Sequence, residues 1–183
     1  MRRITTITAI LALSVLAGIF TGVASAQSPH YKAKGGPNCV DNGLTATCTA
    51  SITGLGNFDV FIKLDAAAVV NTVCVSPGGN EAPGQNPALN VTLSGGLFIP
   101  ASSVKNGNLS FTVSTAPPPT PPPTGPNSAG CANPNWGVRI TDVTFSNGTL
   151  SIFQDLNNDG IFTDGSGGTL NELVIKTTGL TFS

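Results

Sequence analysis

Oxygen-bearing side chains recur at alternate positions in one short run near the end of the chain, Asp155-Leu156-Asn157-Asn158-Asp159-Gly160-Ile161. Ligands at the first, third and fifth positions converge on a hard cation, a glycine at the sixth allows a sharp turn, and the seventh offers its backbone carbonyl. We therefore predict a calcium loop with five ligands, Asp155, Asn157, Asp159, Ile161 and Asp164. With so few charged ligands its Kd for Ca²⁺ would be about 0.1–1 mM.

A plain hairpin turn is the alternative for this run. Ser166 stands at the twelfth position, where an EF-hand loop carries a bidentate glutamate, and the run has no helical pattern on either side. The segment Asn158-Asp159-Gly160 is also typical of tight turns, because these residues tolerate a left-handed backbone. Calcium is the one cofactor that the sequence indicates.

The side chains that enzymes use are few and scattered. The single histidine, His30, lies in a polar segment near the start of the chain, so a serine or cysteine nucleophile would have no base beside it. The acidic residues show no spacing that pairs them. We predict that the chain is not an enzyme; a hydrolase that pairs two of its carboxylates in the fold is the alternative.

The first 26 residues are predicted to be a signal peptide. Arg2 and Arg3 precede an apolar stretch from Ile10 to Phe20, and Ala24-Ser25-Ala26 provides the small residues that signal peptidase requires. The apolar stretch is too short for a membrane-spanning helix, which needs about 20 apolar residues. We expect cleavage after Ala26 and a secreted chain, extracellular, bound to the cell surface or periplasmic.

Four cysteines remain after cleavage, Cys39, Cys48, Cys74 and Cys131. In an exported chain an even number indicates disulfides, and four cysteines allow three pairings. We favour Cys39–Cys48, which closes a short loop, together with Cys74–Cys131, which ties the ends of the long central segment. A zinc site is disfavoured because no two cysteines have C-x-x-C spacing.

Alternation with a period of two predicts β-strands along the rest of the chain. Leu44 to Thr53 alternates most regularly, with Leu44, Ala46, Cys48, Ala50 and Ile52 on one face. Further strands are expected in segments that begin at Phe58, Val69, Leu89, Leu97, Leu109, Trp136, Leu150, Leu170 and Leu180. Within them, a bulge is expected at Thr141-Asp142 and a tight hairpin at Asn147-Gly148.

These strands predict an all-β fold, an immunoglobulin-like β-sandwich of about eight or nine short strands, with a closed barrel as the alternative. Residues 27–37 are expected to be a flexible tail, and residues 38–183 a single domain with a proline-rich surface loop at 116–126. Trp136 follows Cys131 closely, so we expect it in the core against a disulfide.

Charge and composition restrict the partners. Cleavage would leave six basic and nine acidic residues with no basic run, which argues against nucleic acid and anionic membranes as partners. No second long apolar stretch follows the leader, so we expect no membrane insertion. An uncharged edge strand favours self-association or binding to a component of the cell surface or matrix.

Several stretches of the chain together resemble a group of small exported bacterial proteins of unknown function. They are Gly54-Leu55-Gly56-Asn57, Cys74 with 78–87 (GGNEAPGQNP), Lys105-Asn106-Gly107-Asn108, 131–136 (CANPNW) and Val143-Thr144-Phe145. The resemblance supports pairing Cys74 with Cys131 and implies no catalytic residue.

We therefore expect a secreted, non-catalytic structural, adhesion or surface-interaction module, stabilised by calcium if the 155–164 loop binds it. The alternative is an extracellular protein that binds a small ligand, a sugar or an ion, between the loops Ser76–Ala88 and Thr115–Asn135.

Overall fold

The computed structural model describes residues 28–82, 88–119, 131, 133–166 and 169–183. The predicted signal peptide (1–26) and positions 120–126 of the proline-rich loop lie outside these residues. Within them the chain forms two antiparallel β-sheets without an α-helix, so the predicted all-β sandwich is confirmed. The immunoglobulin-like arrangement stays a prediction. No described helix is long and apolar enough to span a membrane.

The first sheet, sheet A, is centred on β3 (Ala46–Thr53). One edge of β3 pairs with β7 (Leu109–Ser114), and the other pairs with β1 (His30–Tyr31) and β2 (Asn38–Asp41). The segment 27–37 was expected to be a flexible tail. From residue 28 on, it instead contains β1 and a hydrogen-bonded connection to β2.

The second sheet, sheet B, is built on two long strands, β4 (Val60–Val75) and β8 (Gly137–Gln154), which pair along their whole length. Strand β6 (Leu89–Ile99) and the short β5 (Glu81–Ala82) pair with the free edge of β4, and β9 (Leu173–Leu180) pairs with β8. A 3₁₀ turn at Ala101–Ser103 leads from β6 toward β7.

The core lies between the two sheets, and every second residue of each strand contributes to it. The predicted inward face is confirmed for Ala46, Cys48, Ala50 and Ile52, which are all buried, but it is wrong for Leu44, which precedes β3 and is 47 % exposed. Cys48, Ala50 and Ile52 pack with alternate buried residues of sheet B, which are Val60, Ile62, Leu64, Leu150 and Ile152, and Ala46 packs with Ala66, Ala68 and Val70 in a second cluster. Burying side chains of this size contributes about 1.5–3 kcal/mol each, which makes this layer the main source of stability.

Hydrogen bonds also join the sheets along both sides. On one side the C-terminal residue reaches β2, where Asp41 N–H donates to the Ser183 carbonyl (3.2 Å) and Ser183 N–H donates to the Cys39 carbonyl (3.3 Å). On the other, Ala116 N–H donates to the Ser94 carbonyl of β6 (2.9 Å). These bonds join sheet B to the β2 edge of sheet A and to the residues that follow β7.

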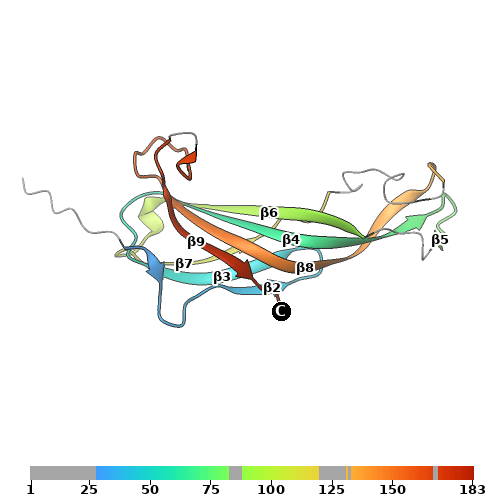
Figure 1. The fold of residues 1–183 in the computed structure, drawn as a ribbon, viewed down its shortest axis with the longest axis horizontal. Coiled ribbons are helices and arrows are strands. Elements are labelled where there is room, and N and C mark those ends of the chain that lie inside the picture. The colour runs from blue at the N-terminus through green and yellow to red at the C-terminus, as the bar shows by residue number, and fades with distance from the viewer. Residues whose placement is uncertain (1–27, 83–87, 120–130, 132, 167–168) are drawn as a thin grey trace, which may run out of the picture.

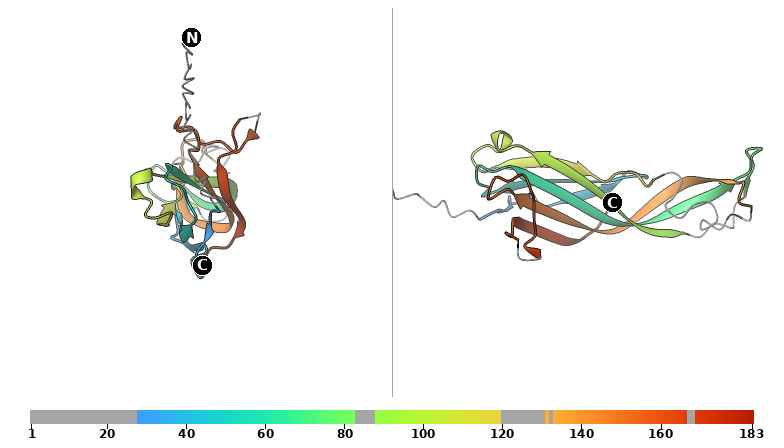
Figure 2. Two further views of the ribbon diagram at one scale, coloured as in Figure 1. Left: turned by 90° about the vertical axis from the view of Figure 1, so that its left-hand side faces the viewer. Right: turned by 90° about the horizontal axis from the view of Figure 1, so that it is seen from above.

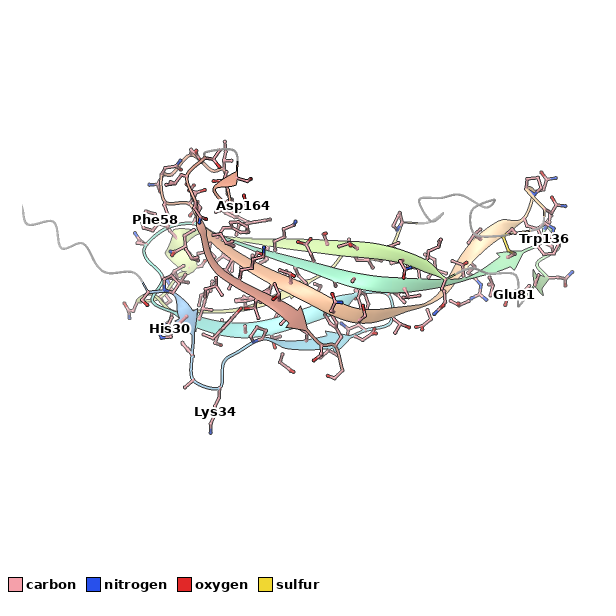
Figure 3. All side chains as sticks on the ribbon, viewed as in Figure 1. His30, Lys34, Phe58, Glu81, Trp136 and Asp164 are labelled. Atoms are coloured by element: carbon pink, nitrogen blue, oxygen red, sulfur yellow. A yellow bond between two sulfur atoms is a disulfide. The ribbon has the colours of Figure 1, made fainter. Side chains whose placement is uncertain are left out.

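The molecule is elongated because β4 and β8 continue beyond sheet A (Figures 1 and 2). Their far parts form a ribbon, which we call the arm, defined by residues 69–75 of β4 and 137–144 of β8; the start of β6 and the short β5 pair with the β4 side of it. The expected bulge is confirmed, since the register shifts at Thr141. Trp136 lies at the end of the arm and is only half-buried, so the prediction of a core tryptophan is wrong (Figure 3).

Both predicted disulfides are formed. Cys39 and Cys48 are directly opposite each other on β2 and β3, and Cys74 near the end of β4 is bonded to Cys131. No described cysteine is free. Two disulfides indicate a chain that folds in an oxidising compartment, extracellular or periplasmic.

Strands β6 and β8 are longer than expected because glycines lie inside them. The predicted hairpin at Asn147-Gly148 is wrong, since β8 runs straight through it. A side chain at Gly148 would come within 2.8 Å of the Phe182 ring, so this glycine allows close packing and does not form a turn. Likewise, β6 passes through Gly95, where a Cβ would lie 1.8 Å from the Ser114 carbonyl.

Candidate functional site

The β8–β9 loop contains the predicted calcium ligands and is anchored by Glu172. The Glu172 side chain is buried, and its carboxylate accepts hydrogen bonds from the N–H groups of Leu156 (Oε1, 2.9 Å) and Thr163 (Oε2, 3.2 Å). Its backbone adds two more, from Gln154 N–H to the Glu172 carbonyl (3.0 Å) and from Glu172 N–H to the Thr163 carbonyl (2.9 Å). One buried residue thus holds both sides of the loop.

Asp155, Asn157 and Asp159 come together in a single turn of this loop. Asp159 N–H donates to Asp155 Oδ1 (3.0 Å) and to Asn157 Oδ1 (3.1 Å), and Gly160 N–H donates to Asp155 Oδ2 (2.9 Å). Asp159 in turn accepts from Asn157 Nδ2 (2.9 Å) and from Ile161 N–H (2.7 Å). Because each oxygen has two lone pairs, these bonds orient the oxygens without using all their capacity.

Asp164 lies apart from that turn. Its backbone forms an isolated bridge with Asn171, and its carboxylate accepts a hydrogen bond from Ser166 N–H (3.0 Å). Bonds from the Ser166 hydroxyl and N–H lower the pKa of Asp164 below its ordinary value. Among the residues described, no three His, Cys, Asp or Glu side chains form a group that could hold a metal ion. The structure therefore gathers the side chains of Asp155, Asn157 and Asp159, but not Asp164.

A cluster of four phenylalanines lies beside this loop, on the outer face of sheet B. Phe61 of β4 pairs with Phe98 of β6 on one side and with Phe153 of β8 on the other, so three rings form a row across the sheet. Phe162 of the loop packs on this row, with its ring centroid 5.4 Å from that of Phe61 and 6.3 Å from that of Phe98. The Phe61 and Phe153 centroids are 6.4 Å apart, also within the usual range for interacting rings.

These rings border a groove of about 430 Å³, which we call the aromatic groove. It is lined by Phe61, Phe153 and Phe162 and by polar side chains, Lys63, Thr163, Asp164, Ser166 and Thr169. Asp164 marks its position in Figure 3, at the end of the molecule opposite the arm. Phe98 in the same cluster is 54 % exposed, unusual for so large an apolar side chain.

Sequence reasoning missed this groove. Val60, Ile62 and Leu64, at alternate positions of β4, are buried in the core. Phe61 and Phe153 stand at the other parity of their strands, which faces solvent in a two-layer fold. Two apolar rings at outward positions were therefore the pattern that could have revealed the groove, but only the register of β4 with β8 shows that they are neighbours.

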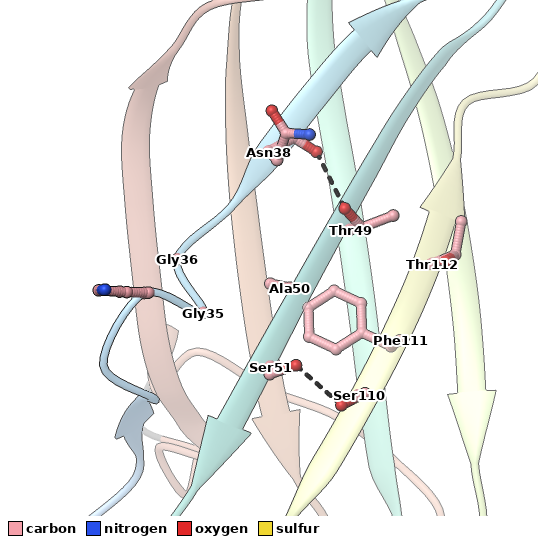
Figure 4. A pocket seen from close by; sticks show the side chains of 10 residues that line it. Gly35, Gly36, Asn38, Thr49, Ala50, Ser51, Ser110, Phe111 and Thr112 are labelled. Atoms are coloured by element: carbon pink, nitrogen blue, oxygen red, sulfur yellow. Dashed lines mark hydrogen bonds between the residues drawn. The ribbon is translucent and has the colours of Figure 1, made fainter.

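A second hollow, of about 490 Å³, lies on the outer face of sheet A (Figure 4). The connection from β1 to β2 borders it, held by Ser51 N–H donating to the Gly35 carbonyl (2.8 Å). Its floor contains hydroxyl groups from two neighbouring strands, and the Ser51 and Ser110 hydroxyls are hydrogen-bonded to each other (2.8 Å). We call it the hydroxyl pocket, lined by Thr49, Ser51, Ser110 and Thr112 among others.

The loops that were expected to form a ligand site, Ser76–Ala88 and Thr115–Asn135, lie partly outside the described residues. Comparison of the chain with protein-family models finds no match, and neither does comparison with curated proteins or with solved structures. The function must therefore be argued from the two hollows and the loop.

Proposed function

We propose that this chain is a secreted, non-catalytic surface-interaction module that adheres to cell-surface or matrix material through the aromatic groove. The observation that carries the proposal is the aromatic cluster on the outer face of sheet B, where Phe98 is exposed and Phe61, Phe153 and Phe162 are half-buried. Exposed apolar patches rimmed by polar residues mark interaction sites, and aromatic side chains dominate the binding energy of such surfaces. The signal peptide predicted at 1–26 supports export, as do the two disulfides.

The framework beneath the groove supports the same function. Three rings of the aromatic cluster stand on β6, β4 and β8, which are paired directly, and the loop that carries the fourth ring is held by buried Glu172. A contact surface fixed in this way loses little conformational entropy on binding. The expected partners are therefore solid or polymeric surfaces, for which a rigid platform is suited.

This function predicts that Phe98→Ser weakens adhesion about tenfold or more, because loss of an aromatic anchor costs roughly 1–2 kcal/mol or more. The measurement is co-sedimentation of the purified mature protein with cell envelopes of the producing organism. Leu44→Ser is the matched control, since Leu44 is 47 % exposed on the connection between β2 and β3. Equal binding by wild type and Phe98→Ser would contradict the proposal.

The second candidate is a small-ligand binding protein that uses the hydroxyl pocket. The observation in its favour is the set of hydroxyls gathered under the β1–β2 connection, since precisely placed polar groups give such pockets specificity. The same assay separates the two functions: if the pocket is the binding site, Ser110→Val loses binding and Phe98→Ser keeps it.

We propose further that Ca²⁺ stabilises the turn that contains Asp155, Asn157 and Asp159. Asp155 and Glu172 are both buried carboxylates, 3 % and 1 % exposed, and neither takes part in the two described ion pairs. Their hydrogen bonds come from backbone N–H groups, so a cation beside them would offset the cost of burying negative charge. The oxygens of the turn are the ligand type that Ca²⁺ prefers.

The calcium proposal predicts a higher melting temperature in calcium than in chelator. At ten times the Kd, binding to the native state adds about 1.4 kcal/mol, a rise of about 3–6 °C for a chain of this size. Asp159→Asn should abolish the rise while it keeps an acceptor for Ile161 N–H. Asp164→Asn is the matched control and should retain it. No rise in the wild type would leave the loop a hydrogen-bonded turn.

A further inference from the structure

We propose that the ligand of the aromatic groove is a carbohydrate chain, whose sugar rings lie against the phenylalanines while their hydroxyls bind the polar rim. The inference rests on the proposed function and names the class of surface to which the module adheres. It depends on how apolar and polar groups alternate across the groove.

The apolar part is a row of rings whose planes are tilted against one another by 30–40°. Phe61 and Phe153 are paired across β4 and β8 with centroids 6.4 Å apart, and Phe162 stands beside Phe61 at 5.4 Å. The face of an aromatic ring carries partial negative charge and attracts polarised C–H groups. A pyranose presents such C–H groups on the flat face of its ring, so it can lie on this row without burying a hydroxyl.

The polar part is a rim that contains both donors and acceptors. Lys63 follows Phe61 by two residues on β4 and therefore stands on the same face of the sheet. Asp164, Thr163, Ser166 and Thr169 line the loop side of the groove. Sugar hydroxyls are donors and acceptors at once, and a mixed rim of an ammonium group, a carboxylate and hydroxyls can satisfy both roles.

The charge of the rim argues against other polymers. Lys63 forms an ion pair with Asp65 (2.9 Å), and Lys176, which stands on the same face across Ser151, acts through its charge on Asp164, so each of the two lysines has a carboxylate near it. Binding to nucleic acid depends on several unbalanced positive charges, which this face lacks. An apolar peptide or a lipid would leave the carboxylate and hydroxyls of the rim without partners when it covered them.

The volume of the groove also fits a ligand of a few sugar rings. A groove of about 430 Å³ lies within the range of about 300–1,000 Å³ that small-ligand sites occupy. It lies on an open sheet face, so it can take a segment from the interior of a longer chain. The ligand class is thus a polysaccharide or an oligosaccharide of a few sugar rings.

The test is co-sedimentation of the mature protein with cellulose, chitin and purified peptidoglycan, followed by calorimetric titration of cellohexaose or chitohexaose. Phe153→Ala should weaken binding about tenfold, from loss of one ring face, and Asp164→Asn about fivefold, from loss of a charged acceptor. Phe153→Leu keeps the apolar volume without the ring and guards against misfolding, and thermal melts confirm the fold of each variant. Leu44→Ser is the control outside the groove.

The outcomes separate this proposal from the function on which it rests. Binding to a polysaccharide that both groove variants weaken and that free oligosaccharide competes away supports the carbohydrate. If Phe153→Ala weakens binding, Asp164→Asn does not, and free oligosaccharide does not compete, the groove binds an apolar ligand and the carbohydrate proposal is overturned. Adhesion to cell envelopes without binding to any polysaccharide would overturn only the proposal that the ligand is a carbohydrate. If the protein neither adheres to cell envelopes nor binds a polysaccharide, the proposed function is overturned as well.

Discussion

Replacing Cys74 and Cys131 together by alanine is expected to lower the free energy of unfolding by about 4 kcal/mol. The bond joins positions 57 residues apart, and closing a loop of that length removes about this much conformational entropy from the unfolded chain. It also ties the end of β4 in the arm to Cys131, six residues before β8 begins. Urea titration of the oxidised proteins measures the change.

The matched control is the pair of alanines at Cys39 and Cys48. These positions are nine residues apart, so the same argument gives a smaller loss of about 2.5–3 kcal/mol. Strands β2 and β3 also keep their backbone pairing without this bond. A greater loss from the short-range pair than from Cys74 and Cys131 would contradict the entropic explanation.

Glu172→Ala is expected to lower the free energy of unfolding by about 2–3 kcal/mol and to free the β8–β9 loop. The substitution removes the acceptor for two part-buried N–H groups, those of Leu156 and Thr163, and each such group costs about 1–3 kcal/mol when it has no partner. Faster amide hydrogen exchange at these two residues should accompany the loss of stability. Phe162 is carried by the same loop, so adhesion through the aromatic groove should also weaken in this variant.

Two further substitutions test that explanation. Glu172→Gln retains one carbonyl oxygen and should lose about half as much stability. Asp142→Ala removes an exposed carboxylate from the arm, and its effect should stay within about 0.5 kcal/mol. If Glu172→Ala were as mild as Asp142→Ala, the loop would not depend on the buried carboxylate.

Much of the fold follows from alternation along the chain. The inward face of β3, the bulge at Thr141 and both disulfides could be predicted, because each depends on local spacing or on a small number of pairings. The lengths of the strands could not be predicted from the sequence. Gly95 and Gly148 lie in segments whose composition is typical of turns. Only the packing of Ser114 and Phe182 against these glycines explains why they lie inside strands.

The candidate site divides in the same way. The turn from Asp155 to Asp159 is a local motif, and the structure gathers its side chains as the spacing indicates. The aromatic groove depends on the register of three strands and on a loop that returns to them, with Phe61, Phe98, Phe153 and Phe162 spread over a hundred residues of sequence. No local pattern contains that information.

The register of β8 with β4 skips two residues, Thr141 and Ser146, and these two bulges have a consequence for fibril growth. The edge of the arm between 137 and 146 pairs with no other described strand, and an unpaired edge is a template on which another chain can polymerise. Thr141 and Ser146 interrupt it, and their hydroxyls bond to the Asn71 and Ala67 carbonyls of β4 (3.1 and 3.3 Å). Only stretches of about four residues remain between these kinks, too short for the six- or seven-residue segments typical of amyloid. The chain has few charges that would repel a second copy, so we expect the two bulges in β8 to be what hinders pairing of copies along this edge.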